Sequence, residues 1–248
     1  MTVMDCLRYV TFISVDDVRV IPKGYDKKSM ATLSVDHVAS VSNATFDEVK
    51  SFGKVVAWKC DDGKIAFCFS NPVINGVKYS TAVAYTENDS FDGNMTISKF
   101  IKSKGRISEI SSLATGELSI VPDAVFRDSE KLYMHYFTTA EETSMDSWKT
   151  SRTGFLVSAD DGKTWSSCGD AFWTANGKFA QAGVARKDGY TYIVGSEPGR
   201  SNDWYKNFFV ARASDGKDFT SPLSYEYWTG NEYEAVEESS VGGDALIT

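Results

Sequence analysis

The sequence predicts an all-β fold, and three observations support this prediction. Short runs of β-branched and aromatic residues recur along the chain, and aromatic residues make up 13% of the sequence, as expected for strands. Asp-Gly pairs separate many of these runs and suit tight turns, because glycine adopts a positive φ without steric cost. No stretch of about 12 or more residues carries the apolar stripe of an amphipathic helix.

The expected strands begin near the N-terminus. The first, 7–15, is followed after an Asp16-Asp17 turn by a second at 18–21. Segment 23–51 is polar and lacks sustained periodicity, so we expect irregular structure with a short helix around 46–49. Strands then dominate, and they are expected at 55–58, 65–69, 81–85, 95–97, 118–121, 124–126, 132–137, 154–157, 179–185, 190–194 and 208–212.

Five Asp-Gly turns give these strands a rough period. The intervals between their glycines are 30, 69, 27 and 27 residues, and the glycines are Gly63, Gly93, Gly162, Gly189 and Gly216. Two turns in each unit of about 54 residues would suit four-stranded propeller blades, slightly longer than the usual repeat of roughly 40–50 residues. On this basis the chain would form about four and a half blades. A β-sandwich is the alternative all-β architecture.

The segment from Ser158 to Trp165 matches the Asp-box pattern S-x-D-x-G-x-T-W at every fixed position. We expect Gly162 to take a positive φ in a hairpin turn, with Ser158, Asp160 and Thr164 bonding backbone groups that the turn leaves unpaired. Trp165 would then act as an apolar plug. The pattern predicts the structural outer hairpin of a propeller blade, not a catalytic group, and an ordinary Asp-Gly hairpin is the alternative.

Charge and length limit the partners. The net charge of −8 argues against nucleic acid or an anionic membrane surface, since both require a basic face. No apolar run is long enough for a membrane-spanning helix, so no membrane insertion is expected. Residues 1–8 contain Asp5 where a signal peptide has a basic region, so no signal peptide is expected. Three interpretations stay open: the protein is cytoplasmic, it is a domain of a larger protein, or it belongs to a virion or another assembly.

No metal or cofactor is expected. The chain has no C-x-x-C pair, and only two histidines, His37 and His135, could join a zinc site. Cys60 and Cys68 flank the turn at 61–63, which leaves open a cross-strand disulfide or two buried free thiols. We favour the free thiols, because nothing in the sequence fixes an oxidising compartment.

Several segments together resemble a known family. They are 120–123, 132–136 with Trp148, 179–185, 188–200, 209–212 and 225–230. They resemble a group of bacterial five-bladed β-propellers, long labelled a domain of unknown function, some of which are glycoside hydrolases that cut D-arabinan of actinobacterial cell walls. The resemblance implies propeller blades over residues 51–248. Residues 1–50, with N-terminal strands and an irregular segment, would close the ring; otherwise the chain is incomplete or a partner chain completes the last blade.

The chain departs from this family where catalytic acids are expected. Members carry a D-L-G segment and an F-G-D-T segment, whereas this chain has Ser51-Phe52-Gly53 and Phe69-Ser70-Asn71-Pro72. Glycoside hydrolysis generally needs two carboxyl groups, and neither serine nor asparagine replaces one. Two classes of function therefore stay open. The first is a glycoside hydrolase-like enzyme acting on cell-wall arabinan or a related polysaccharide; the second is a non-catalytic glycan-binding or structural module, for example in a phage virion.

Five residues are candidates for the site itself, with a polysaccharide or oligosaccharide as the expected ligand. Asp123 and Glu197 are the candidate catalytic carboxyl groups, with a turn aspartate as the alternative for Asp123. Arg200 could bind sugar hydroxyls with its planar guanidinium or simply pair with Glu197. Gln181 and His135 interrupt apolar strands, and each is either a substrate contact or a hydrogen-bonded core residue. Four tryptophans could stack on sugars or belong to the core: Trp148, Trp173, Trp204 and Trp228.

Overall fold

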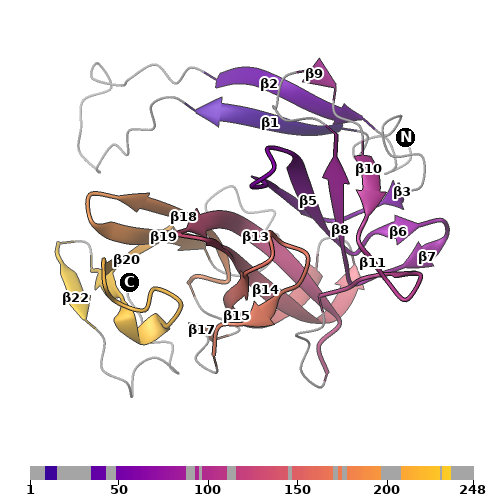
Figure 1. Cartoon of the computed structure of the whole chain (residues 1–248). Helices are drawn as coiled ribbons and strands as arrows, with labels where there is room; N and C mark the ends of the chain where they lie inside the picture. Colours follow the sequence, from indigo (N-terminus) through magenta and orange to yellow (C-terminus); the bar gives the residue numbers. More distant parts are fainter. Residues whose placement is uncertain are drawn as a thin grey trace.

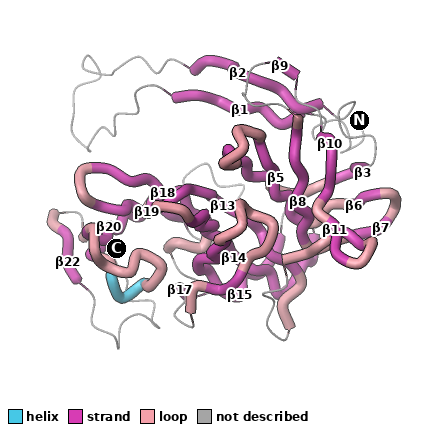
Figure 2. Tube along the Cα trace, in the orientation of Figure 1, coloured by secondary structure: helices cyan, strands magenta, loops and turns pink. Residues whose placement is uncertain are grey.

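The computed structural model describes residues 9–15, 35–42, 49–87, 93–94, 97–110, 116–144, 147–169, 173–174, 178–196, 208–229 and 231–235. Within these ranges every regular element is a strand except the 3-10 turn η4 (Pro222–Ser224), which is cyan in Figure 2. The predicted all-β class is therefore confirmed. None of the described residues forms a helix of the length and apolarity needed to cross a membrane.

Three sheets are antiparallel meanders, in which each strand pairs with the next one of the sheet along the chain (Figure 1). The first meander contains β4 (Val55–Lys59), β5 (Ile65–Ser70), β8 (Thr81–Thr86) and β10 (Ile97–Phe100). The second contains β13 (Ser119–Asp128), β14 (Lys131–Ser144), β15 (Ser147–Ser158) and β16 (Ser166–Ser167), and β17 (Trp173–Thr174) also pairs with β15. The third contains β18 (Gln181–Lys187), β19 (Tyr190–Ser196), β20 (Phe209–Ser214), β21 (Glu226–Trp228) and β22 (Tyr233–Ala235).

The first strands of the three meanders lie together, because β13 lies against both β4 and β18. Apolar cores fill the spaces between neighbouring meanders. Trp58 and Cys68 of the first meander pack with Met134 and Leu156 of the second. An aromatic core that includes Phe155 and Tyr227 joins the second meander to the third. The fold thus brings three consecutive sheets together at their first strands.

Smaller sheets flank the meanders. One joins β1 (Tyr9–Val15) and β2 (Val35–Ser42) in antiparallel pairing, with β9 (Gly93–Asn94) parallel to β2. A second joins β3 (Val49–Ser51), β6 (Val73–Ile74) and β7 (Val77–Lys78), where Asn75 and Gly76 both have positive φ in the hairpin turn. The third pairs β11 (Lys102–Ser103) with β12 (Arg106–Ile107).

Some expectations for the first hundred residues were wrong. Strand β2 lies in the polar segment that was expected to be irregular, because its ladder to β1 overrides weak local periodicity. Gly93 lies in β9 and not in a turn. Val49 begins strand β3, while 46–48, the rest of the expected helix, lie outside the described residues, as do 18–21 and 95–96.

Later in the chain, the strands expected at 118–121 and 124–126 form one continuous strand, β13. The other expected strands of the three meanders are present, with ends shifted by a few residues and β14 and β15 considerably longer than expected.

Cys60 and Cys68 are both free and buried, which confirms the preferred interpretation. Cys68 lies opposite Val56 in the β4–β5 ladder, whereas Cys60 follows the end of β4, so the two thiols are not a cross-strand pair. Burial raises the pKa of the Cys68 thiol to about 12, so this thiol is inert near neutral pH.

Deleting residues 1–22 would remove β1 and leave one edge of β2 without its partner. We expect the truncated chain to aggregate, because unpaired N–H and C=O groups on a strand edge recruit other strands. Light scattering and size-exclusion chromatography at matched concentration would measure this. A truncated chain that stays monomeric and as stable as the full chain would contradict the prediction.

Candidate functional site

Asp123 lies at an irregularity in strand β13. Pro122 pairs with Tyr136 and Ala124 pairs with His135, so Asp123 has no residue opposite it in the β13–β14 ladder. Such bulges turn a side chain away from its regular direction and are common next to active sites. The side chain of Asp123 is fully buried.

Three donors surround the Asp123 carboxylate, and together they form what we call the Asp123 cluster. Lys54 Nζ binds one carboxylate oxygen, Oδ1. The other oxygen, Oδ2, lies 3.2 Å from Nδ1 of His135 and accepts a hydrogen bond of 3.2 Å from the backbone N–H of Ala182. These donors come from all three meanders, since Lys54 directly precedes β4, His135 lies in β14 and Ala182 lies in β18. The cluster therefore joins the three first strands through one buried acceptor.

Aromatic rings surround His135, whose side chain is also fully buried. Phe155 meets its ring edge-on with centroids 5.2 Å apart, and the Trp173 centroid lies 6.2 Å away. The second imidazole nitrogen, Nε2, has no hydrogen-bond partner among the described residues.

The backbone around Lys54 is fixed by Ser70. The N–H of Lys54 donates to Ser70 Oγ at 2.8 Å, and the N–H of Ser70 donates back to the Lys54 carbonyl at 2.9 Å. Gly53 fits beside this pair, because a Cβ there would lie only 2.7 Å from Ser70 Oγ. The Lys54 side chain is 44% exposed, so it is the part of the Asp123 cluster that meets solvent.

The structure places some of the predicted site residues together. Asp123 and His135 are in contact, and Gln181 directly precedes Ala182 on β18, half-buried and opposite Ser196. Glu197 and Arg200 lie outside the described residues, so the Asp123–Glu197 pair stays a prediction. Sequence reasoning missed Lys54, although it follows directly on the Ser51-Phe52-Gly53 segment.

Ser51 and Asn71 lie at the two positions where the family resemblance led us to expect acids. Ser51 is exposed on β3. Asn71 has a φ of 47°, a left-handed conformation that asparagine tolerates better than most residues, and its amide nitrogen lies 3.3 Å from Ser119 Oγ.

A second buried carboxylate was also missed from the sequence. Glu117, whose side chain is 2% exposed, pairs with Arg152 through two bonds of 2.9 and 3.2 Å. It also accepts a hydrogen bond of 2.7 Å from Thr138 Oγ1. Two fixed bonds to a planar guanidinium are typical of a structural ion pair that orders a sheet end.

Of the four tryptophans, Trp173 is buried and belongs to the aromatic core, whereas Trp228 is 39% exposed. The Trp148 side chain and Trp204 lie outside the described residues. Within the described ranges, no group of three or more His, Cys, Asp or Glu could hold a metal ion.

The turn at 158–165 makes a closed set of hydrogen bonds. Asp160 accepts from Ser158 Oγ at 2.8 Å, from the Thr164 N–H at 2.8 Å and from Thr164 Oγ1 at 2.6 Å. Ser158 Oγ accepts from the Gly162 N–H at 2.8 Å, and Trp165 Nε1 donates to the Gly162 carbonyl at 3.0 Å. Gly162 has a φ of +88°. These contacts are the ones that a structural turn requires.

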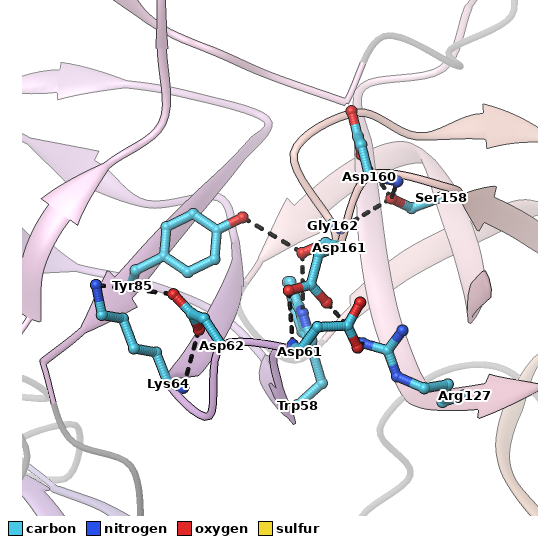
Figure 3. Close-up of polar contacts among 10 residues, drawn as sticks. All are labelled: Trp58, Asp61, Asp62, Lys64, Tyr85, Arg127, Ser158, Asp160, Asp161 and Gly162. Atoms are coloured by element: carbon cyan, nitrogen blue, oxygen red, sulfur yellow. Dashed lines mark hydrogen bonds and ion pairs between the residues drawn. The ribbon is translucent and has the colours of Figure 1, made fainter. Parts of the chain in front are cut away.

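The same turn also joins two meanders (Figure 3). The Asp161 carboxylate accepts from Arg127 at 2.6 Å and from the N–H of Asp61, in the β4–β5 turn, at 2.9 Å. Trp58 Nε1 and the Tyr85 hydroxyl both reach the Asp161 carbonyl at 3.4 Å. The turn therefore ties the second meander to the first.

The fold and the Asp123 cluster define an all-β protein of repeated meanders with a buried charged cluster at their first strands. The chain belongs to the family described as "Domain of unknown function (DUF4185)", whose sequence profile matches residues 56–242. A similar solved structure is that of alpha-L-arabinofuranosidase from Lactobacillus brevis, with 13% identity and a TM-score of 0.44. The alignment covers 79% of this chain and 60% of that one, so this chain spans less than two thirds of its length. Comparison with curated proteins gives no match.

Replacing Asp160 by Ala should lower the free energy of unfolding by about 1–2 kcal/mol, the usual effect of losing a cap or turn hydrogen bond. Burial acts to raise the pKa of Asp160, but hydrogen bonds from Thr164, Ser158 and Lys163 outweigh it and hold the pKa below its ordinary value. The stabilisation is therefore complete above about pH 4 and is lost as the pH falls through the folded-state pKa.

Denaturant unfolding of wild type and Asp160→Ala from pH 7 down to pH 3 would measure both effects. The difference between the two proteins should shrink at the acid end. Loss of ligand binding without loss of stability would contradict a structural role for the turn.

Proposed function

We propose that this protein binds a furanose-rich cell-wall polysaccharide, such as arabinan, and cleaves it weakly or not at all. The resemblance of residues 51–248 to arabinan-cutting propellers supports a carbohydrate ligand, and the family match at 56–242 covers nearly the same region. We expect inefficient cleavage because the hydrogen-bond capacity of the Asp123 carboxylate is already used inside the protein. This carboxylate is fully buried and already surrounded by Lys54, His135 and Ala182, so it is an engaged acceptor.

The proposal includes a five-bladed propeller. The three meanders would be consecutive blades, with β4, β13 and β18 as their inner strands around the axis. Support comes from the contacts of β13 with β4 and β18 and from the up-and-down order of each sheet. Residues 1–50 would help to close the ring and residues 51–248 would supply the blades, with a partner chain as the alternative source of the last strands.

In this arrangement the Asp123 cluster is a binding centre near the propeller axis. The Lys54 side chain is 44% exposed, and its ammonium group, held by Asp123, would donate to sugar hydroxyls. Gln181, and Arg200 and Glu197 from the segment after β19, are the further proposed sugar contacts.

One observation favours hydrolysis as a second candidate. Asp123 lies in a strand bulge at the junction of three sheets, and bulges often direct catalytic side chains. Asp123 and Glu197 would then be a replacement carboxyl pair, and Asp123→Asn would abolish cleavage.

Titration of arabinan-derived oligosaccharides by calorimetry, with reducing ends measured on the same samples, tests the proposal. We expect saturable binding and little or no release of reducing ends. Robust cleavage by the wild-type chain would contradict the binding function and favour the second candidate, and absence of binding would contradict both.

The paired variant Ser51→Asp with Asn71→Asp adds a gain-of-function arm. If this chain lacks only the two catalytic carboxyl groups and keeps the rest of the site, the paired variant should turn over substrate faster than wild type. The reason is that a carboxylate pair can contribute several orders of magnitude to the rate.

A further inference from the structure

The outer face of the third meander carries aromatic side chains around one arginine. Residues alternate along its strands, so Thr191, Ile193, Ala211 and Tyr227 are buried, the last three in the core shared with the second meander. Their neighbours point to the opposite side. Because the strands are in register, this outer face includes Tyr190, Tyr192, Arg212, Glu226, Trp228 and Tyr233, with Lys187 of β18 opposite Tyr190.

Arg212 is held in place between two rings. Its guanidinium carbon lies 4.5 Å from the ring centroid of Tyr190 and 3.8 Å from that of Tyr233. Its Nε donates to Glu226 Oε2 at 3.0 Å, so the positive charge is balanced on the face itself. Stacked arginine of this kind loses little conformational freedom when it binds a further acceptor.

Trp228 provides an exposed ring at one end of this row. Its indole is 39% exposed and packs against Tyr233 with ring centroids 5.1 Å apart. Tyr233 therefore holds the Trp228 ring at a fixed angle while part of its surface stays in water.

We propose that this outer face is a second binding surface for the same neutral polysaccharide, with Trp228 stacking on a sugar ring. The inference rests on the proposed function. An uncharged sugar chain is the occupant that fits best, because the face around Trp228 consists of aromatic rings and the charges of Arg212 and Glu226 beside them are already paired. Lys187 also lies on this face, but on β18, three strands away from Trp228. Aromatic rings match the apolar faces of sugars, and the remaining N–H groups of Arg212 match their hydroxyls.

Calorimetric titration of arabinan-derived oligosaccharides into Trp228→Ala, Trp228→Tyr and Leu223→Ala tests this. Leu223, in η4, is the matched control because it is 42% exposed and apolar. We expect Trp228→Ala to weaken binding about tenfold, Trp228→Tyr to retain most of the affinity, and Leu223→Ala to have no effect. Thermal unfolding of each variant would show whether it is folded.

This experiment distinguishes failure of the second binding surface from failure of the proposed function. Equal affinity of Trp228→Ala and Leu223→Ala, in a wild-type protein that binds sugar, would overturn the second surface and leave the proposed function standing. A wild-type protein that binds no sugar would overturn both. A concentration-dependent dimer that Trp228→Ala abolishes, without any sugar effect, would identify the face as a protein interface and overturn the inference.

Discussion

Gly162→Ala should lower the free energy of unfolding by about 2–5 kcal/mol, among the largest effects of a single methyl group in this protein. Two costs add. The residue has a φ of +88°, which costs any residue with a Cβ roughly 1–2 kcal/mol. In addition, the new Cβ would lie 2.3 Å from Cζ2 of Trp58, a ring atom in the core between the first two meanders.

Gly216→Ala is the matched control for this experiment. Gly216 also follows an aspartate and has a φ of +84°, but an added Cβ would meet nothing within 4 Å. Denaturant unfolding of both variants separates the backbone cost from the clash. Equal losses in the two variants would show that the turn does not press against Trp58.

Asp123→Ala should cost about 2–4 kcal/mol of unfolding free energy, because it removes the acceptor from buried donors on two neighbouring sheets. His135 Nδ1 and the Ala182 N–H would be left without this partner, whereas the Lys54 side chain, which is 44% exposed, can turn to water. Asp123→Asn should cost less, since its amide oxygen still accepts one hydrogen bond.

Asp128→Ala, on the same strand, is the control. Asp128 pairs with Arg186, which is 36% exposed, so the loss should stay below about 1 kcal/mol. Thermal or denaturant unfolding of the three variants at neutral pH would measure the series. A loss for Asp123→Ala no larger than that for Asp128→Ala would contradict the joining role of the Asp123 cluster.

The sequence was most informative where local chemistry decides the structure. Gly162 and Asp160 belong to a turn whose bonds close within eight residues, so a short pattern was sufficient to predict them. The meander strands were also predictable, because each carries a run of β-branched and aromatic residues that favours a strand locally. Strand β2 was missed because its pairing with β1 is decided by residues far away in the chain, not by its own composition.

The candidate site was predictable only in part. Asp123 stood out because it follows a proline at the end of an expected strand, and His135 because it interrupts an apolar run. Lys54 did not, because an isolated lysine after a glycine reads as an ordinary surface residue. Its role arises from the meeting of β4 with β13, a tertiary contact that no local pattern encodes. Glu117 and Arg152, 35 residues apart in sequence, were missed for the same reason.

The central claim is that sugar binds at the Asp123 cluster through its exposed lysine, and Lys54→Met tests it most directly. Lys59→Met is the matched control, since Lys59 is an exposed lysine at the opposite end of β4. Calorimetry with arabinan-derived oligosaccharides should show a loss of affinity of about tenfold or more for Lys54→Met and none for Lys59→Met, with both proteins folded at the temperature of the titration. Unchanged affinity in folded Lys54→Met would contradict the claim.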